Sequence, residues 1–242
     1  MFGDLSSELA RLEAQAQACF RLERPVYQSL GLLRECDVLD VGCGSGGPAS
    51  LLMKEGCRVT GVDRDASYTT EVPPGMRRFT ADAANLPFKT ASFDFAYSRL
   101  AFQHLPNPVA AAEEMTRVTR PDGRVVIVDA DHSCRSVFPP LHSVTKATSR
   151  WIERAQKIGA NAEIGPALPG ILATVGLRDI RVDVVQVDTT HLSKRTFADI
   201  LLAPMLSTIA NKDSGTLEQW VANPAAYAFA PLFIVSGRVP YP

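Results

Sequence analysis

The sequence lacks any strong excess of charge. Its 242 residues include 25 Lys and Arg against 26 Asp and Glu, which gives a formal net charge of −1. No run of basic residues occurs, so nothing in the sequence would attract the phosphate backbone of a nucleic acid or an anionic membrane surface. We therefore expect no nucleic-acid partner and no broad electrostatic attachment to lipid.

Long apolar runs are also missing. The longest markedly apolar stretch, residues 227–235, is too short to span a bilayer and contains a proline. Residues 1–5 show no basic segment followed by a continuous apolar core, so no export signal is evident. The sequence thus predicts a cytoplasmic chain without membrane insertion.

Paired cysteine motifs are absent as well. The five cysteines are an odd, scattered set with no C-x-x-C pair, which favours free thiols in a reducing compartment over a disulfide framework or a zinc site. They are Cys19, Cys36, Cys43, Cys57 and Cys134.

The most informative segment is a glycine-rich turn. An aliphatic run over residues 37–41 leads into the turn at 42–47, and Pro48 stands where a helix would begin. Such a strand, turn and helix bring backbone N–H groups close to a nucleotide-like ligand. Asp63 ends the next apolar run, roughly 20 residues after the first glycine, which is the spacing at which a carboxylate can bind a ribose.

Two classes of ligand fit this turn. Gly42, Gly44 and Gly47 satisfy the dinucleotide pattern G-x-G-x-x-G. Asp40 argues against a dinucleotide, because a fixed carboxylate there would repel a pyrophosphate by a few kcal/mol. The same carboxylate suits a ligand with an ammonium and a sulfonium group. S-adenosylmethionine (SAM) is such a ligand, and it offers a ribose to Asp63.

Further motifs follow in a fixed order. Segment 40–46 reads D-V-G-C-G-S-G, segment 81–88 reads A-D-A-A-N-L-P-F, segment 92–99 reads as a strand, and R-P-D-G follows at 120–123 as a turn before the next strand. Over roughly residues 30–190 the chain resembles a class I SAM-dependent methyltransferase, closest to its small-molecule branch of quinone, tocopherol and natural-product enzymes. The resemblance implies SAM as cofactor and S-adenosyl-L-homocysteine as its product.

The resemblance also implies a set of cofactor contacts. An acid at the end of the second strand binds both ribose hydroxyls, the residue after it packs on the adenine, and a second acid hydrogen-bonds the adenine amino group. In this chain Cys43 is expected to matter through its backbone N–H rather than its thiol. The predicted cofactor-binding residues are Asp40, Gly42, Cys43, Gly44, Asp63, Arg64, Asp82, Ala83, Ser98 and Arg99.

Alternating strand and helix patterns predict an α/β fold. We expect a Rossmann-like sheet of seven strands, mostly parallel, with helices on both faces. The resemblance implies that the last strand is antiparallel. The predicted strands cover 37–42, 58–62, 76–80, 93–98, 124–129, about 180–184, and 229–237; the predicted helices start near Pro108 and at roughly 166–175, the latter closed by Gly176.

The chain is expected to form a single domain over residues 1–242. Residues 1–33 would form N-terminal helices, and residues 34–131 the SAM-binding core. Segments 132–163 and 189–226 do not fit the minimal scaffold, and we interpret them as insertions that form an α-helical lid. The alternative is that they only extend the helical layer.

Methyl transfer needs positioning and exclusion of water, and it needs a base only when the acceptor must lose a proton. His104, after the fourth predicted strand, is the best candidate for that base, although a packed residue that lines the pocket fits equally. Asp129, Asp131 and His132 cluster after the fifth strand. They lack the adjacent Asp–Asn pair of metal-dependent enzymes, so we predict no metal.

Two further absences narrow the substrate. No N-P-P-Y follows the fourth strand, as it does in enzymes that methylate amide or adenine amino groups, and no Pro-Cys nucleophile suggests a cytosine enzyme. The aromatic residues expected to line an apolar acceptor pocket are Phe138, Trp151, Phe197, Trp220 and Tyr227.

The sequence thus predicts a monomeric or homodimeric enzyme that methylates oxygen, nitrogen or carbon of a small, largely apolar metabolite. Two alternatives stay open. One is a SAM-binding cyclase or pericyclase that does not transfer the methyl group, and the other is a regulatory SAM-binding module.

Overall fold

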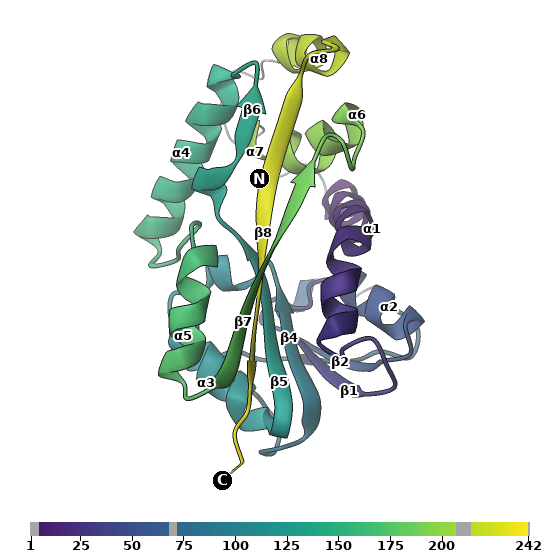
Figure 1. Cartoon of the computed structure of the whole chain (residues 1–242), viewed down its shortest axis with the longest axis vertical. Helices are drawn as coiled ribbons and strands as arrows, with labels where there is room; N and C mark the ends of the chain where they lie inside the picture. Colours follow the sequence, from purple (N-terminus) through teal and green to yellow (C-terminus); the bar gives the residue numbers. More distant parts are fainter. Residues whose placement is uncertain (1–4, 68–71, 207–213, 242) are drawn as a thin grey trace.

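The computed structural model describes residues 5–67, 72–206 and 214–241, and its centre is one mixed β-sheet (Figure 1). The hydrogen-bonded strand order is β3-β2-β1-β4-β5-β8-β6, and β7 also pairs with β8. The strands are β1 (Asp37–Val41), β2 (Arg58–Asp63), β3 (Arg77–Thr80), β4 (Phe93–Arg99), β5 (Thr119–Ala130), β6 (Ser136–Phe138), β7 (Arg178–Asp188) and β8 (Tyr227–Arg238).

Strands β1 to β5 are parallel, and β8 is antiparallel to β5, β6 and β7. The mostly parallel α/β sheet and the antiparallel last strand are therefore confirmed. The sheet has eight strands instead of the expected seven. The additional strand is β6, which pairs with the first residues of β8 and is too short, at three residues, to show a period in the sequence.

The start of β5 also differs from the prediction. Arg120–Gly123 was expected to be a turn, whereas β5 already begins at Thr119. The pairing with β4 shifts register between Phe93 and Phe95, and Asp122 has a φ of 66°, so the expected turn is an irregularity within the ladder. A Cβ at Gly123 would lie 2.5 Å from the carbonyl oxygen of Asp94, which explains the glycine.

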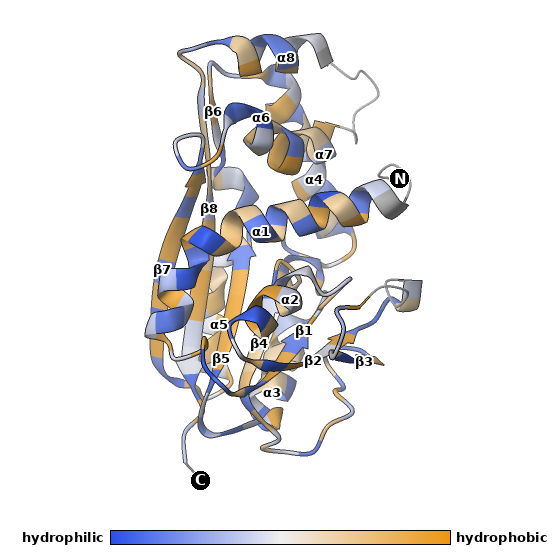
Figure 2. Ribbon diagram, turned by 90° about the vertical axis from the view of Figure 1, so that its right-hand side faces the viewer, coloured by the Kyte–Doolittle hydropathy of each residue, from blue (hydrophilic) through white to orange (hydrophobic). Residues whose placement is uncertain are grey.

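Helices cover both faces of the sheet, as Figures 1 and 2 show. On one face lie α1 (Leu5–Ser29) and α2 (Gly47–Lys54), and on the other α3 (Pro108–Val118) and α5 (Leu168–Thr174). The N-terminal segment is one helix with Pro25 inside it. Helix α3 begins where the Asn107 side chain accepts a hydrogen bond from the Ala110 N–H, a standard N-cap.

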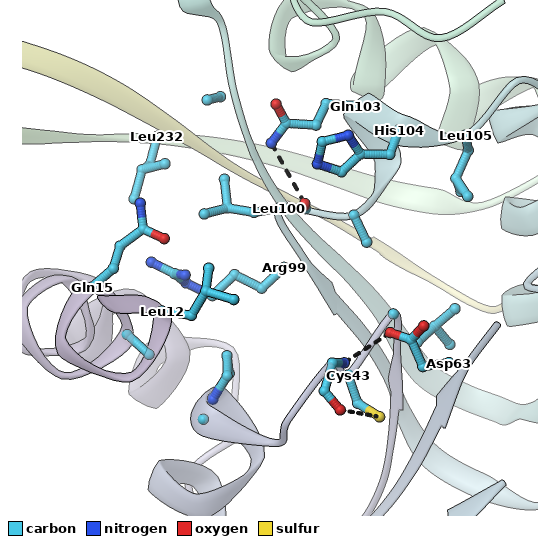
Figure 3. A pocket seen from close by; sticks show the side chains of 18 of the residues that line it. Leu12, Gln15, Cys43, Asp63, Arg99, Leu100, Gln103, His104, Leu105 and Leu232 are labelled. Carbon is cyan, nitrogen blue, oxygen red and sulfur yellow. Dashed lines mark hydrogen bonds between the residues drawn. The ribbon is translucent and has the colours of Figure 1, made fainter. Parts of the chain in front are cut away.

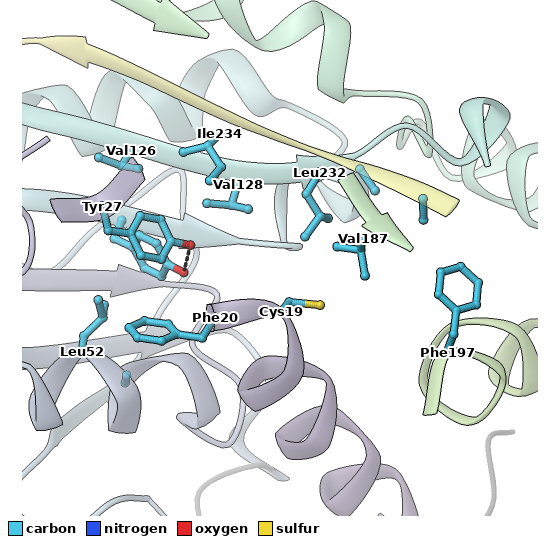
Figure 4. Close-up of a cluster of buried hydrophobic side chains, with 14 of the residues drawn as sticks. Cys19, Phe20, Tyr27, Leu52, Val126, Val128, Val187, Phe197, Leu232 and Ile234 are labelled. Carbon is cyan, nitrogen blue, oxygen red and sulfur yellow. Dashed lines mark hydrogen bonds between the residues drawn. The ribbon is translucent and has the colours of Figure 1, made fainter. Parts of the chain in front are cut away.

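The two faces have separate hydrophobic cores. The core under α1 contains Phe20, whose ring points toward Leu52 of α2, and Tyr27, which lies beside Val126 and Val128 of β5 (Figure 4). A single apolar stripe along α1 thereby fixes the helix across the sheet. The position of α1 matters because its first half projects beyond the sheet toward the site described below (Figure 2).

Helices α4 (His142–Lys157), α6 (Lys194–Phe197), α7 (Ala203–Leu206) and α8 (Ser214–Ala222) gather beyond the carboxyl end of β5 (Figure 1). The shorter helical segments are η2 (Phe102–His104), η3 (His132–Cys134), η4 (Gly165–Ala167) and the π-helical η5 (Ala198–Leu202). None of the helices in the described ranges is both long and apolar enough to cross a bilayer. All five cysteines are free thiols.

Candidate cofactor and acceptor site

A cavity of about 610 Å³ opens at the carboxyl ends of the parallel strands. Open α/β sheets bind their ligands at this edge. The glycine turn, the end of β2 and segment 81–84 form one side of the cavity, whereas α1, η5 and the middle of β8 form the other. Figure 3 shows Leu12 and Gln15 of α1 on one side and Asp63 and Cys43 on the other.

The glycine turn exposes its backbone to this cavity. Gly42 and Gly44 have φ values of 77° and 51°, in the left-handed region that favours glycine. A Cβ at Gly42 would lie 2.4 Å from the Cβ of Ala101, while a Cβ at Gly44 would meet no atom within 4 Å. The turn therefore packs tightly on the strand-four side and leaves open space at Gly44, where a ligand can approach the main chain.

Asp63 stands at the end of β2 and lines the cavity. Its Oδ2 accepts a hydrogen bond from the Gly44 N–H at 2.8 Å, and its Oδ1 accepts one from the Asp65 N–H at 2.9 Å. Each carboxylate oxygen has a second lone pair, so the same side chain can bind two ribose hydroxyls while it holds the turn.

Three more predicted residues lie on the same wall: Arg64, Asp82 and Ala83. Arg64 and Asp82 are exposed to solvent at the rim, and the Asp82 Oδ1 accepts a hydrogen bond from the Ala84 N–H at 2.9 Å. This bond fixes the carboxylate and leaves its other oxygen for a ligand.

Asp40 lies beneath the turn rather than on the cavity wall. Its side chain is buried, and its Oδ2 has no hydrogen-bond partner. Burial, together with the charge of Asp63, raises the pKa of this carboxyl to about 7. A buried carboxylate without a counterion fits a cationic ligand above it and opposes a pyrophosphate, so the residues present suit SAM.

Ser98 and Arg99, both predicted to bind the cofactor, differ in their position relative to the cavity. Ser98 is fully buried, its Oγ donates to the Val41 carbonyl at 2.8 Å, and it does not line the cavity. Arg99 lines the cavity, but its guanidinium pairs with Glu23 of α1 at 2.8 Å. Ser98 therefore joins β4 to β1, and Arg99 joins β4 to α1; neither partner is visible in the local sequence.

A buried polar network around Arg99 was missed by the sequence reasoning. The Tyr27 hydroxyl donates to the Glu23 Oε2 at 2.6 Å and lies 3.1 Å from the Tyr97 hydroxyl. Burial raises the pKa of both tyrosines well above the usual value, so both hydroxyls keep their protons. The sequence signal that could have indicated this network is Glu23, a charged residue on the otherwise apolar face of α1.

His104 lies on the cavity wall, in η2 beside Gln103 and Leu105 (Figure 3). The ring faces solvent within the cavity and packs edge-on against Trp151, with 6.0 Å between ring centroids. The pKa of His104 is lowered first by the protein around the ring, which displaces water and disfavours the charged form, and then by the positive charge of Arg64. The imidazole is therefore neutral near pH 7 and able to accept a proton.

His132 is held more firmly. Its Nε2 lies 2.7 Å from the Gln103 Oε1, and its Nδ1 lies 3.2 Å from the Nη2 of Arg135. Burial, and then the charge of Arg135, lower its pKa to about 3. Both ring nitrogens are engaged, so His132 positions its neighbours rather than acting as a free base.

The two acids near His132 have structural partners. Asp129 is fully buried and accepts hydrogen bonds from the Gln103 and Ala130 N–H groups at 3.0 and 2.8 Å. The Asp131 Oδ1 accepts hydrogen bonds from the backbone N–H and the hydroxyl of Ser133 at the start of η3. The described ranges contain no group of three or more His, Cys, Asp or Glu side chains placed to hold a metal ion.

The side of the cavity opposite the glycine turn is mostly aliphatic. Of the five aromatics expected to line it, only Trp151 does so. Phe197 is buried in the core, and Trp220 is buried with its indole N–H donating to the Phe138 carbonyl at 3.0 Å. The sequence could not distinguish these positions, because aromatic residues serve cores and pockets alike. The aliphatic wall consists of Leu12, Ala16, Val187, Ile200, Leu201 and Leu232.

Comparison with known proteins identifies the family of the chain. Residues 39–127 match the family model described as "Methyltransferase domain". Methyltransferase GfsG of Streptomyces halstedii is 34% identical over 128 residues, which cover 49% of this chain and 46% of that protein. The malonyl-[acyl-carrier protein] O-methyltransferase of Erwinia billingiae is 30% identical over 196 residues, which cover 69% of this chain and 75% of that protein. The chain spans about half the length of GfsG and of several similar curated relatives.

Solved structures share the fold. The [4+2]-cyclase SpnF has a TM-score of 0.60 and 18% identity, with 93% of this chain and 83% of that chain covered. The phosphoethanolamine N-methyltransferase 2 of Haemonchus contortus, solved with SAM, has a TM-score of 0.52 and 20% identity, with 86% and 49% covered. From the matching domain and relatives, and with SAM as cofactor, this chain belongs to the class I SAM-dependent methyltransferases.

Proposed function

We propose that the protein transfers the methyl group of SAM to a small, largely apolar metabolite of natural-product or quinone-type biosynthesis. The observation that carries the proposal is that one cavity has a polar wall, built from the glycine turn and Asp63, and an aliphatic wall from α1, η5 and β8. A cofactor on the polar wall leaves the aliphatic wall for the acceptor.

Bound SAM supplies an electrophilic methyl group. On this proposal the Gly44 main chain, Asp63 and Asp82 hold and orient the cofactor. Helix α1, segment 132–163 and residues 200–205 form a lid that excludes water, since residues of each line the cavity opposite the glycine turn. Orientation of the two reactants and exclusion of water account for most of the rate increase in such a displacement.

His104 is the proposed base for an acceptor that must lose a proton. Its ring is exposed within the cavity and, in the part of the chain that the structure describes, no side chain hydrogen-bonds it. His132, in contrast, has both ring nitrogens engaged. Of the two cavity histidines, His104 is the one free to accept a proton from a ligand.

The fold likeness to the cyclase SpnF motivates one alternative, a SAM-binding cyclase that keeps its methyl group. Incubation with SAM carrying a deuterated methyl group and a panel of small apolar acceptors separates the two. Methyl transfer predicts a labelled product and one S-adenosylhomocysteine per product. A product that forms without label and without S-adenosylhomocysteine contradicts methyl transfer and supports the cyclase.

A further inference from the structure

Of the four arginines that line the cavity, Arg11 and Arg99 form ion pairs with a glutamate. Arg11 pairs with Glu8 at 2.6 Å, and Arg99 pairs with Glu23 at 2.8 Å. Arg64 is exposed to water at the cofactor end of the cavity. Arg135 lies on the acceptor side after the end of β5 and, unlike Arg64, is only partly exposed to water.

Arg135 contacts only uncharged groups. Its Nη2 donates to the Nδ1 of His132 at 3.2 Å, and its Nη1 contacts the sulfur of Met205. Its Nε is shielded from solvent and has no hydrogen-bond partner. Within residues 5–67, 72–206 and 214–241, no carboxylate forms an ion pair with it.

A guanidinium in such surroundings stays charged. Burial lowers the pKa of Arg135 to about 10, which is still far above neutral pH. An ion removed from water without a counterion costs several kcal/mol, and a ligand that brings the opposite charge recovers much of that cost. The charge therefore favours an anionic ligand at this end of the cavity.

The side chains behind Arg135 hold it in place. Because a guanidinium can only donate, the Nδ1 of His132 must carry a lone pair and its Nε2 must carry the proton. The Nε2–H then donates to the Gln103 Oε1 at 2.7 Å, and the Gln103 main chain donates to the buried Asp129. This chain of bonds fixes one edge of the guanidinium and leaves the second N–H of Nη1 and of Nη2 for a ligand.

We propose that Arg135 binds a carboxylate of the methyl acceptor, so that the acceptor is an apolar acid rather than a neutral lipid-like molecule. The inference rests on the proposed function. A carboxylate fits better than a phosphate, because a single guanidinium matches its one charge and its planar shape. The aliphatic wall of Leu12, Ile200 and Leu232 contacts the apolar body of the acid.

The test compares 2-naphthoate with its neutral analogue 2-naphthamide by titration calorimetry, with and without saturating S-adenosylhomocysteine. The wild-type protein should bind the acid at least about tenfold more tightly than the amide, because one charge-assisted pair distinguishes the two. Arg135→Met should lose this preference and keep its affinity for the amide. Arg135→Lys should retain part of the preference.

Arg11→Met is the matched control, since Arg11 lines the same cavity but is already paired with Glu8; this variant should keep the preference. Equal binding of the two probes by the wild type, binding of neither, or a preference that survives in Arg135→Met would overturn the proposal. Titration of S-adenosylhomocysteine alone, with circular dichroism for folding, tests the cofactor site separately. A protein that prefers the acid but does not bind S-adenosylhomocysteine would contradict the proposed function and leave the role of Arg135 intact.

Discussion

At the scale of single residues, we expect cofactor binding to depend most on the side chain of Asp63. Its carboxylate holds the Gly44 and Asp65 N–H groups and faces the cavity. Asp63→Ala should weaken SAM binding by about 2–4 kcal/mol, because two ribose hydroxyls lose a charged acceptor and the turn loses a bond. Calorimetry checks this; near-native affinity in a folded variant would refute the ribose role.

Asp82 should contribute less, because it lies exposed at the rim of the cavity. Asp82→Ala should weaken SAM binding by about 1–2 kcal/mol through loss of one contact to the adenine amino group. The control is an SAM analogue without that amino group. If wild type and variant discriminate equally between SAM and the analogue, Asp82 is not the contact.

Asp40 should make SAM binding depend on pH. Its pKa in the folded protein is about 7, above the ordinary value of 3.8. The stability of the unliganded fold should therefore decrease as pH rises from about 3.8 to about 7, because ionising the buried carboxyl is unfavourable. A cationic ligand favours the ionised form, and SAM affinity should therefore increase as pH rises through about 7. Calorimetry from pH 6 to 8 should show this increase in the wild type and a flat profile in Asp40→Asn. An equal slope in both would exclude Asp40.

His104→Ala should lower turnover by about 10²–10⁴ with little effect on SAM affinity, if the acceptor must lose a proton. The pH–rate profile should show an acidic limb below the ordinary histidine pKa of 6.5, since its surroundings lower the pKa of His104. A His104→Gln enzyme that keeps both the rate and the limb would leave positioning alone as the mechanism.

At the scale of secondary-structure elements, the Glu23–Arg99 pair joins α1 to β4 inside the protein. Glu23→Met or Arg99→Met alone should destabilise the fold by about 3–5 kcal/mol, because each leaves a buried charge without its partner. The double variant should be less destabilised than the sum of the two. Denaturant unfolding of the three variants measures this coupling. Additive effects would show that the pair does not connect the two elements.

The sequence predicted elements best where local signals were strong. The five parallel strands and Gly176, with its left-handed φ of 80°, lie where the patterns placed them. Strand β6 exists only through its pairing with β8, and the irregular start of β5 depends on the contact between Gly123 and Asp94. Long-range pairing of this kind leaves no periodic trace in a short segment.

At the scale of the whole molecule, the cavity wall that contains the glycine turn could be predicted from the sequence, and the opposite wall could not. Asp63 and the glycine turn belong to one strand–turn–helix unit with a recognisable spacing. Arg135 and Leu232 face the same cavity only because β5 and β8 pair, although the 96 residues 131–226 separate these two strands in the sequence. Ser98 and Arg99 were assigned to the cofactor because their distant partners Val41 and Glu23 could not be seen.

Titration of the wild-type protein with SAM and, separately, with NADH shows whether the glycine turn, Asp40 and Asp63 form a site for a cationic nucleoside rather than a dinucleotide. We expect one SAM bound per chain, binding that Asp63→Ala weakens by about 2–4 kcal/mol, and no comparable affinity for NADH. Absence of SAM binding, or NADH binding as tight as that of SAM, would contradict this assignment of the site.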